Sequence, residues 1–82
     1  MIELQLFARY REVLGMDKEH IDWQPELTSL RALRDWLIQR GDPWQVLGEA
    51  QLMCARNQTM CNLDEPLADG DEVAFFPPVT GG

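Results

Sequence analysis

The chain has 82 residues, which suits one small domain with a limited core. It carries seven basic and fourteen acidic residues, and the formal net charge of −7 argues against nucleic acid or membrane partners, which attract basic patches. Glu3 interrupts the N-terminal apolar run and no stretch approaches membrane-spanning length, so we expect neither a signal peptide nor an anchor. The two cysteines, Cys54 and Cys61, fit a reduced, cytoplasmic protein.

The first part of the chain predicts a strand, a helical turn and a second strand. Apolar and polar side chains alternate over residues 2–8, which is typical of a half-buried strand, and this places Phe7 on the polar face. Residues 9–14 predict a short helical turn that stops at Gly15, and residues 19–23 predict a short second strand. The buried face of the first strand would consist of Ile2, Leu4, Leu6 and Ala8.

The main helix is expected to begin after Thr28-Ser29, which supplies an N-cap. Leucines then recur at helical spacing, and Gly41 followed by Asp42-Pro43 ends the pattern. Residues 44–47 predict a further short turn. The residues expected to face the core are Leu30, Leu33, Leu37 and Trp36.

A hairpin is predicted next, with strands over 51–56 and 60–63 joined by residues 57–59. We place Arg56 opposite Met60. This register puts Met53, Ala55, Cys61 and Leu63 inside, and Cys54, Arg56, Met60 and Asn62 outside. Since Cys54 and Cys61 would then point to opposite faces, no disulfide is expected between them.

The last strand, residues 72–76, follows the turn signal at Asp69-Gly70. Val73 and Phe75 would face the core, and Phe76 would lie exposed. Pro77 and Pro78 remove two backbone donors and end the strand. We expect them to begin a flexible tail, residues 77–82, whose two final glycines can follow a path that a Cβ would block.

These elements predict a single α+β domain over residues 1–82, with one main helix packed on one face of a mixed sheet. A specific set of residues also resembles the family of small, sulfur-carrying subunits of molybdopterin synthase, within the ubiquitin-like sulfur carriers. The resemblance implies a β-grasp roll, in which the first and last strands pair in parallel at the sheet centre. The residues that carry it are Phe7-Ala8, Arg11-Glu12, Gly15, Asn57-Gln58, Pro66-Leu67, Asp69 to Val73 and Phe76 to Gly82.

The resemblance also implies a function for the tail. The Gly82 carboxyl group would be adenylated by a ubiquitin-activating-like adenylyltransferase, which uses ATP, and then converted to a thiocarboxylate, a covalent 1-thioglycine. Inserted into the large synthase subunit, in a heterotetramer, it would donate sulfur to the cyclic pyranopterin precursor to form the molybdopterin dithiolene. The chain alone would be non-catalytic and hold no tightly bound cofactor. The inserted residues would be Pro77, Pro78, Val79, Thr80 and Gly81.

Three large apolar residues, Phe7, Met60 and Phe76, are predicted on the outer face, as a patch that seats the partner and aims the tail. No metal site is expected, because Cys54 and Cys61 lack ligand spacing and His20 is the only histidine. Two alternatives share the same terminus: a sulfur carrier for thiazole or tRNA thiolation, and a non-catalytic ubiquitin-like interaction module or modifier.

Overall fold

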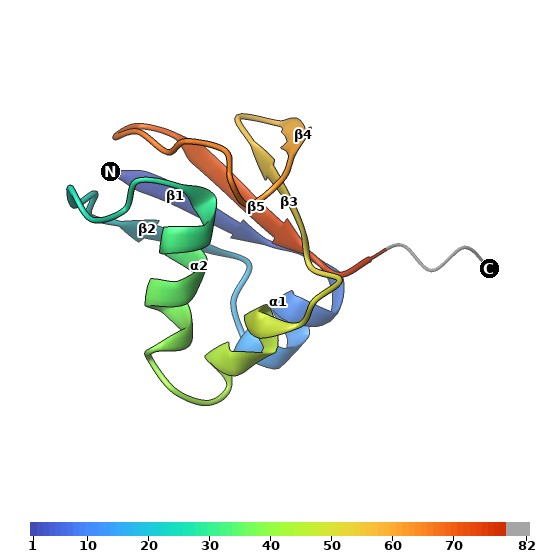
Figure 1. The fold of residues 1–82 in the computed structure, drawn as a ribbon. Helices are drawn as coiled ribbons and strands as arrows, with labels where there is room; N and C mark the ends of the chain where they lie inside the picture. The colour runs from blue at the N-terminus through green and yellow to red at the C-terminus, as the bar shows by residue number, and fades with distance from the viewer. Residues whose placement is uncertain (79–82) are drawn as a thin grey trace.

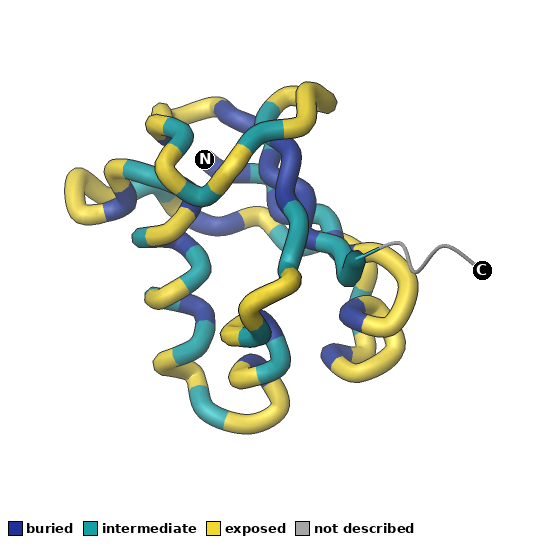
Figure 2. Tube along the Cα trace, turned by 45° about the vertical axis from the view of Figure 1, so that its right-hand side comes forward, coloured by how far each residue is buried: buried dark blue, intermediate teal, exposed yellow. Residues whose placement is uncertain are grey.

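The computed structural model describes residues 1–78, and it has an α+β fold in which a five-stranded mixed sheet carries its helices on one face (Figure 1). The strand order is β2-β1-β5-β3-β4. In Figure 2 the buried residues gather in the central strands and on the sides of the helices that face them. The elements are β1 Ile2–Leu6, α1 Ala8–Leu14, β2 Lys18–Ile21, α2 Leu30–Ile38, the 3-10 helix η1 Trp44–Gly48, β3 Met53–Arg56, β4 Thr59–Cys61 and β5 Glu72–Phe76.

The first and last strands form the centre of the sheet. β1 and β5 run parallel, with Leu4 opposite Val73 and Leu6 opposite Phe75, which confirms the predicted pairing. Antiparallel neighbours, β2 and β3, flank this pair on either side. Because the inward side chains of both central strands are at most 1% exposed, β5 is held by packing as well as by two hydrogen-bonded ladders.

Helix α2 supplies the other half of the core. The Ser29 Oγ accepts a hydrogen bond from the Ala32 amide at 3.1 Å, so the predicted N-cap is present. The leucines expected to face the core are fully buried, because their spacing puts them on one side of the helix. They are Leu30, Leu33 and Leu37.

Helix α1 is longer than the predicted turn and changes where β1 ends. Ala8 has φ 53° and begins the helix, whereas the sequence pattern had placed it on the core face of the first strand. Phe7 is the extended N-cap residue, and Gly15 ends the helix with φ 71°, as expected. The backbone therefore turns away from the sheet directly after Phe7.

The hairpin register differs from the prediction by one residue. Asn57 and Gln58 both have positive φ and form a two-residue turn, so Arg56 lies opposite Thr59, and Cys54 lies opposite Cys61. The predicted three-residue connection is wrong, and so is the assignment of β3 faces. Cys54 is 2% exposed in the core, while Met53 and Ala55 lie on the other face of the sheet, where Ala55 is buried as well.

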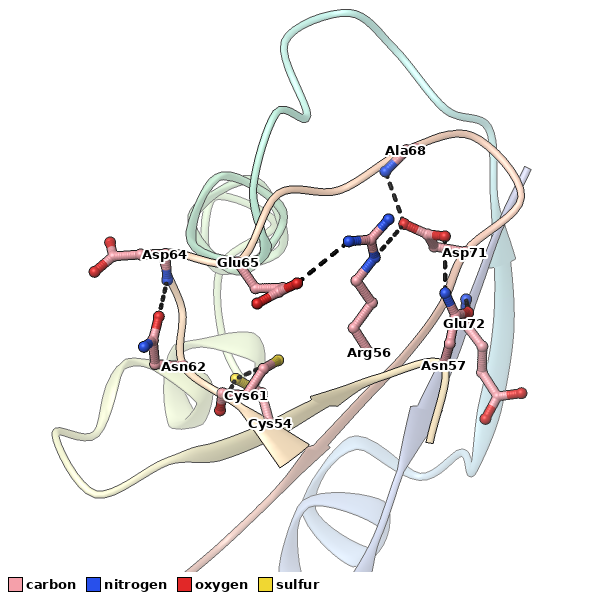
Figure 3. A network of polar contacts seen from close by, with 10 residues as sticks. All are labelled: Cys54, Arg56, Asn57, Cys61, Asn62, Asp64, Glu65, Ala68, Asp71 and Glu72. Carbon is pink, nitrogen blue, oxygen red and sulfur yellow. Dashed lines mark hydrogen bonds and ion pairs between the residues drawn. The ribbon is translucent and has the colours of Figure 1, made fainter. Parts of the chain in front are cut away.

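A buried carboxylate joins the hairpin to the start of β5 (Figure 3). Asp71, 8% exposed, accepts hydrogen bonds from Arg56 Nε at 2.8 Å, Asn57 Nδ2 at 3.0 Å and the Ala68 amide at 2.8 Å. The Asn57 side chain in turn accepts from the Glu72 amide at 2.9 Å. Burial alone would raise the pKa of Asp71, but these donors outweigh it and hold the pKa below its ordinary value.

A second polar cluster ties α2 to the edge strand β2. The Arg40 guanidinium donates two hydrogen bonds to the Glu19 carboxylate, at 2.9 and 2.6 Å. It also lies 5.0 Å from the ring centroid of Trp36 and 4.6 Å from that of Trp44. The hydrogen bonds from Arg40 lower the pKa of Glu19, so this pair remains ionised at neutral pH.

Candidate functional site

The described chain leaves the sheet at the C-terminal end of β5. The Phe7 amide donates to the Phe75 carbonyl at 3.3 Å, and Phe76 is the last residue of the strand. Pro77 and Pro78 follow without secondary structure, as predicted, because neither has an amide hydrogen to extend the ladder. The predicted tail residues Val79, Thr80, Gly81 and Gly82 lie outside the described residues.

Two aromatic rings lie at the point where the chain leaves the sheet. Phe7 and Phe76 meet edge to face, with ring centroids 6.5 Å apart and an interplanar angle of 81°. Phe7 is 43% exposed. Phe76 was expected to be exposed and is instead half-buried, because Phe7 packs against it. The structure therefore brings together two of the three residues predicted for the interface.

The third, Met60, is 54% exposed on β4, and the corrected register connects it to the aromatic pair. Met53 is the β3 neighbour of Phe76, and Ala55 lies between Met60 and Ala74. These side chains share the sheet face that carries no helix. We call this surface the tail-base patch. It consists of Phe7, Met53, Met60 and Phe76, together with the buried Ala55 and Ala74 on the same face of the sheet.

The sequence interpretation missed Met53 and Ala55 because it placed both in the core. Their faces follow from the hairpin length, and Gln58, which is neither Gly nor Asn, gives no sequence signal for a two-residue turn. A two-residue Asn57-Gln58 turn reverses the faces of β3 relative to a three-residue connection. With that register, apolar residues extend the patch across the strands that separate Phe76 from Met60.

The opposite end of the same face is polar. Glu3 lies between Glu72 on β5 and His20 on β2. The Gln5 amide donates to the Glu3 carboxylate at 2.9 Å, and His20 Nε2 lies 3.4 Å from it. The hydrogen bond from Gln5, followed by that from His20, lowers the pKa of Glu3. The open face is therefore apolar beside the tail and charged away from it.

Within residues 1–78 no group of three or more His, Cys, Asp or Glu side chains could hold a metal ion. His20 lies on the edge strand β2, and its imidazole faces the Glu3 carboxylate. No helix in this part of the chain is long and apolar enough to cross a membrane. What the geometry provides is a rigid central strand that ends beside an apolar surface.

Comparison with families and curated proteins gives matches over nearly the whole chain. The model of the ThiS family matches residues 4–82. The chain is 43% identical to the molybdopterin synthase sulfur carrier subunit of Escherichia coli, over 83 aligned positions that cover all of both chains.

Solved structures show the same ubiquitin-like β-grasp fold. SAMP1 of Haloferax volcanii, a small archaeal modifier protein, has a TM-score of 0.73 at 33% identity, covering 99% of this chain and 98% of its own. A complex of subunits 1 and 2 of the molybdopterin-converting factor of Helicobacter pylori contains a chain with a TM-score of 0.65 at 27% identity. That match covers 99% of this chain and 97% of the other.

Proposed function

Since the chain belongs to the ThiS family, we propose that it is the sulfur-carrier subunit of a molybdopterin synthase. It is a small subunit that works within a complex and is non-catalytic alone. Gly82 is the residue that carries sulfur, and the tail residues Pro77, Pro78, Val79, Thr80 and Gly81 insert it into the partner.

The observation that carries this proposal is the position of β5. The strand is fixed between β1 and β3, its start is held by Asp71, and its end leads straight into Pro77 and Pro78. Four residues follow Pro78, and an extended segment of that length reaches roughly 13–14 Å. A carboxyl group on such an arm can enter an active site while the domain stays outside.

The chemistry requires an activating enzyme. A carboxylate is a poor electrophile and is ionised at neutral pH, since the α-carboxyl pKa is about 3.3–3.7. Attack of the Gly82 carboxylate on the α-phosphorus of ATP forms an acyl adenylate and releases pyrophosphate. A sulfur nucleophile then displaces AMP and leaves the thiocarboxylate. The chain has no Gly-rich phosphate loop, so ATP is bound and consumed by an adenylyltransferase partner, and no cofactor is held tightly here.

The tail-base patch is the surface that seats the partner. It combines aromatic and Met side chains, which are enriched at interface centres, and it lies next to the residues that lead into the tail. The Helicobacter pylori structure pairs subunit 1 with subunit 2, which supports a large-subunit partner for this chain. We assign the assembly as a heterotetramer in the cytoplasm, a compartment in which Cys54 and Cys61 rest as free thiols.

The test is intact mass spectrometry of the full chain after incubation with an adenylyltransferase of this class, ATP and a sulfur source. The expected product has one oxygen of the Gly82 carboxyl group replaced by sulfur, localised by fragmentation. Sulfur found as a persulfide on Cys54 or Cys61 would contradict the proposal. Gly81→Leu is the matched variant: it should keep the fold but transfer little sulfur, because a side chain there obstructs insertion.

The likeness to SAMP1 favours a second candidate, a ubiquitin-like modifier. A modifier joins its terminal carboxyl group to lysine amines, so it would appear in cells as isopeptide adducts that contain Gly82. A carrier for thiazole or tRNA thiolation would charge the same residue but deliver sulfur elsewhere. Reconstitution with a large synthase subunit and the cyclic pyranopterin precursor separates these functions, because only the synthase carrier yields the dithiolene.

A further inference from the structure

The two cysteines lie next to each other across the β3–β4 hairpin. Cys54 and Cys61 are directly opposite in the antiparallel ladder, and their Sγ atoms are 4.0 Å apart (Figure 3). Opposed residues have Cα atoms about 4.5–5.5 Å apart, which lies inside the range of about 4.4–6.8 Å that disulfides use. This spacing is within the range in which a disulfide can join the two strands.

The two thiols differ in their exposure to solvent. Cys54 is 2% exposed, and burial, followed by the neighbouring Cys61, raises the pKa of its thiol to about 12. Cys61 is partly exposed on the edge strand. Both line an open cavity of about 320 Å³ between the hairpin and α2, which Arg31, Leu52 and Leu63 also border. A small oxidant in this cavity reaches Cys61 first, with Cys54 directly behind it.

We propose that Cys54 and Cys61 form an oxidisable dithiol, which hydrogen peroxide converts into a disulfide across the hairpin. The Cys61 sulfur attacks one peroxide oxygen, the O–O bond breaks, and a sulfenic acid and water result. The Cys54 sulfur then attacks the sulfenyl sulfur. The S–OH bond breaks, and hydroxide leaves with the Cys54 proton as a second water. Two thiols thus lose two electrons and two protons, and one peroxide is reduced to two waters.

The order of the two steps follows from the structure. The Cys54 Sγ donates to the Cys61 carbonyl at 3.4 Å, so its proton points toward the partner residue rather than toward solvent. A buried thiol is inert toward external oxidants, whereas a sulfenic acid 4.0 Å away is an internal electrophile. Cys61 is therefore the residue that meets the oxidant and Cys54 the residue that resolves it.

The experiment treats the reduced full chain with a graded excess of peroxide, then unfolds it in denaturant, alkylates the remaining thiols and measures the intact mass. The expected product has lost two hydrogen atoms, resists alkylation at both cysteines, and regains both thiols with dithiothreitol. Oxidation of the exposed Met60 adds an oxygen atom, so it is distinguished by mass. Peptide mapping without reductant should recover the Cys54 and Cys61 peptides as one linked species.

Two variants test the order in which Cys61 and Cys54 react. In Cys54→Ala, Cys61 should accumulate as a sulfenic acid that dimedone traps. In Cys61→Ser, the buried Cys54 should react at least roughly tenfold more slowly. Circular dichroism establishes that each variant is folded, and Cys54→Ser replaces Cys54→Ala if the smaller side chain destabilises the core. The proposal is overturned if the cysteines of the wild-type chain retain oxygen or form only intermolecular disulfides. It is also overturned if no form reacts, because Cys61 then fails to meet the oxidant.

Discussion

Replacing Asp71 by Asn is expected to destabilise the domain, although the two side chains have nearly the same shape. The carboxylate accepts three hydrogen bonds, two of them at Oδ2 from Arg56 and Ala68 and one at Oδ1 from Asn57. An Asn side chain has one acceptor oxygen, so its amino group must face a donor. Asn57 cannot rotate to compensate, because its own oxygen accepts from the Glu72 amide.

The expected loss is about 2 kcal/mol, since a hydrogen bond to a charged group contributes roughly 1.5–3 kcal/mol and Arg56 keeps a contact with Glu65. For a domain of this size, about 2 kcal/mol corresponds to a Tm lower by roughly 8–16 °C. Urea unfolding followed by tryptophan fluorescence measures the difference, and the slope of the free energy with urea should remain unchanged.

The pH dependence gives a second check. The folded pKa of Asp71 lies below its unfolded value, so its stabilisation is complete above the unfolded pKa of about 3.9 and is lost as the pH falls through the folded pKa. The difference in free energy of unfolding between wild type and Asp71→Asn should therefore disappear in acid. Asp69→Asn, on an exposed carboxylate of the same turn, is the control and should change stability little. Equal stability of Asp71→Asn and wild type at pH 7 would refute the reasoning.

Three further substitutions test the site and the helix that supports the sheet. Phe76→Ala should weaken binding to the large subunit by about 2 kcal/mol, roughly thirtyfold in Kd. The control Val13→Ala, on the exposed surface of α1, should leave the affinity unchanged. Titration calorimetry measures both, and an unchanged affinity for Phe76→Ala would reject the tail-base patch as the binding surface. Ser29→Ala should lower the free energy of unfolding by about 1 kcal/mol through loss of the α2 cap, with Thr28→Ala as the neutral control in the same urea assay. Arg40→Lys should lower the free energy of unfolding by about 1 kcal/mol, because Lys cannot make the paired hydrogen bonds to the Glu19 carboxylate. It should also alter tryptophan emission, because the guanidinium lies over the Trp44 ring, and an unaltered spectrum would count against this ring contact.

Much of the fold could be predicted from alternation and spacing. The period of two in β1 identified its buried face, and the leucine spacing with Ser29 located α2, because both patterns follow directly from backbone geometry. The parallel pairing of β1 with β5 came from family resemblance instead. Pairing between segments so far apart leaves no local trace in a single sequence.

The hairpin register could not be predicted, because Gln58 adopts a positive φ without being Gly or Asn. That one residue decided the faces of β3, and with them the position of Cys54 and the extent of the tail-base patch. Asp71 was missed for a related reason. Its partners come from the hairpin and the preceding loop, so nothing in its local sequence marks this turn carboxylate as buried.

The place of β5 between β1 and β3 also determines how the domain bears mechanical load. Traction on the residues after Phe76 acts along the strand axis, while the hydrogen bonds on both sides run across it. Both ladders are therefore sheared together, rather than opened one bond at a time as they would be in an edge strand. The rate of forced unfolding depends on the height of the unfolding barrier, so a partner can pull on the C-terminal end of this domain without unfolding it.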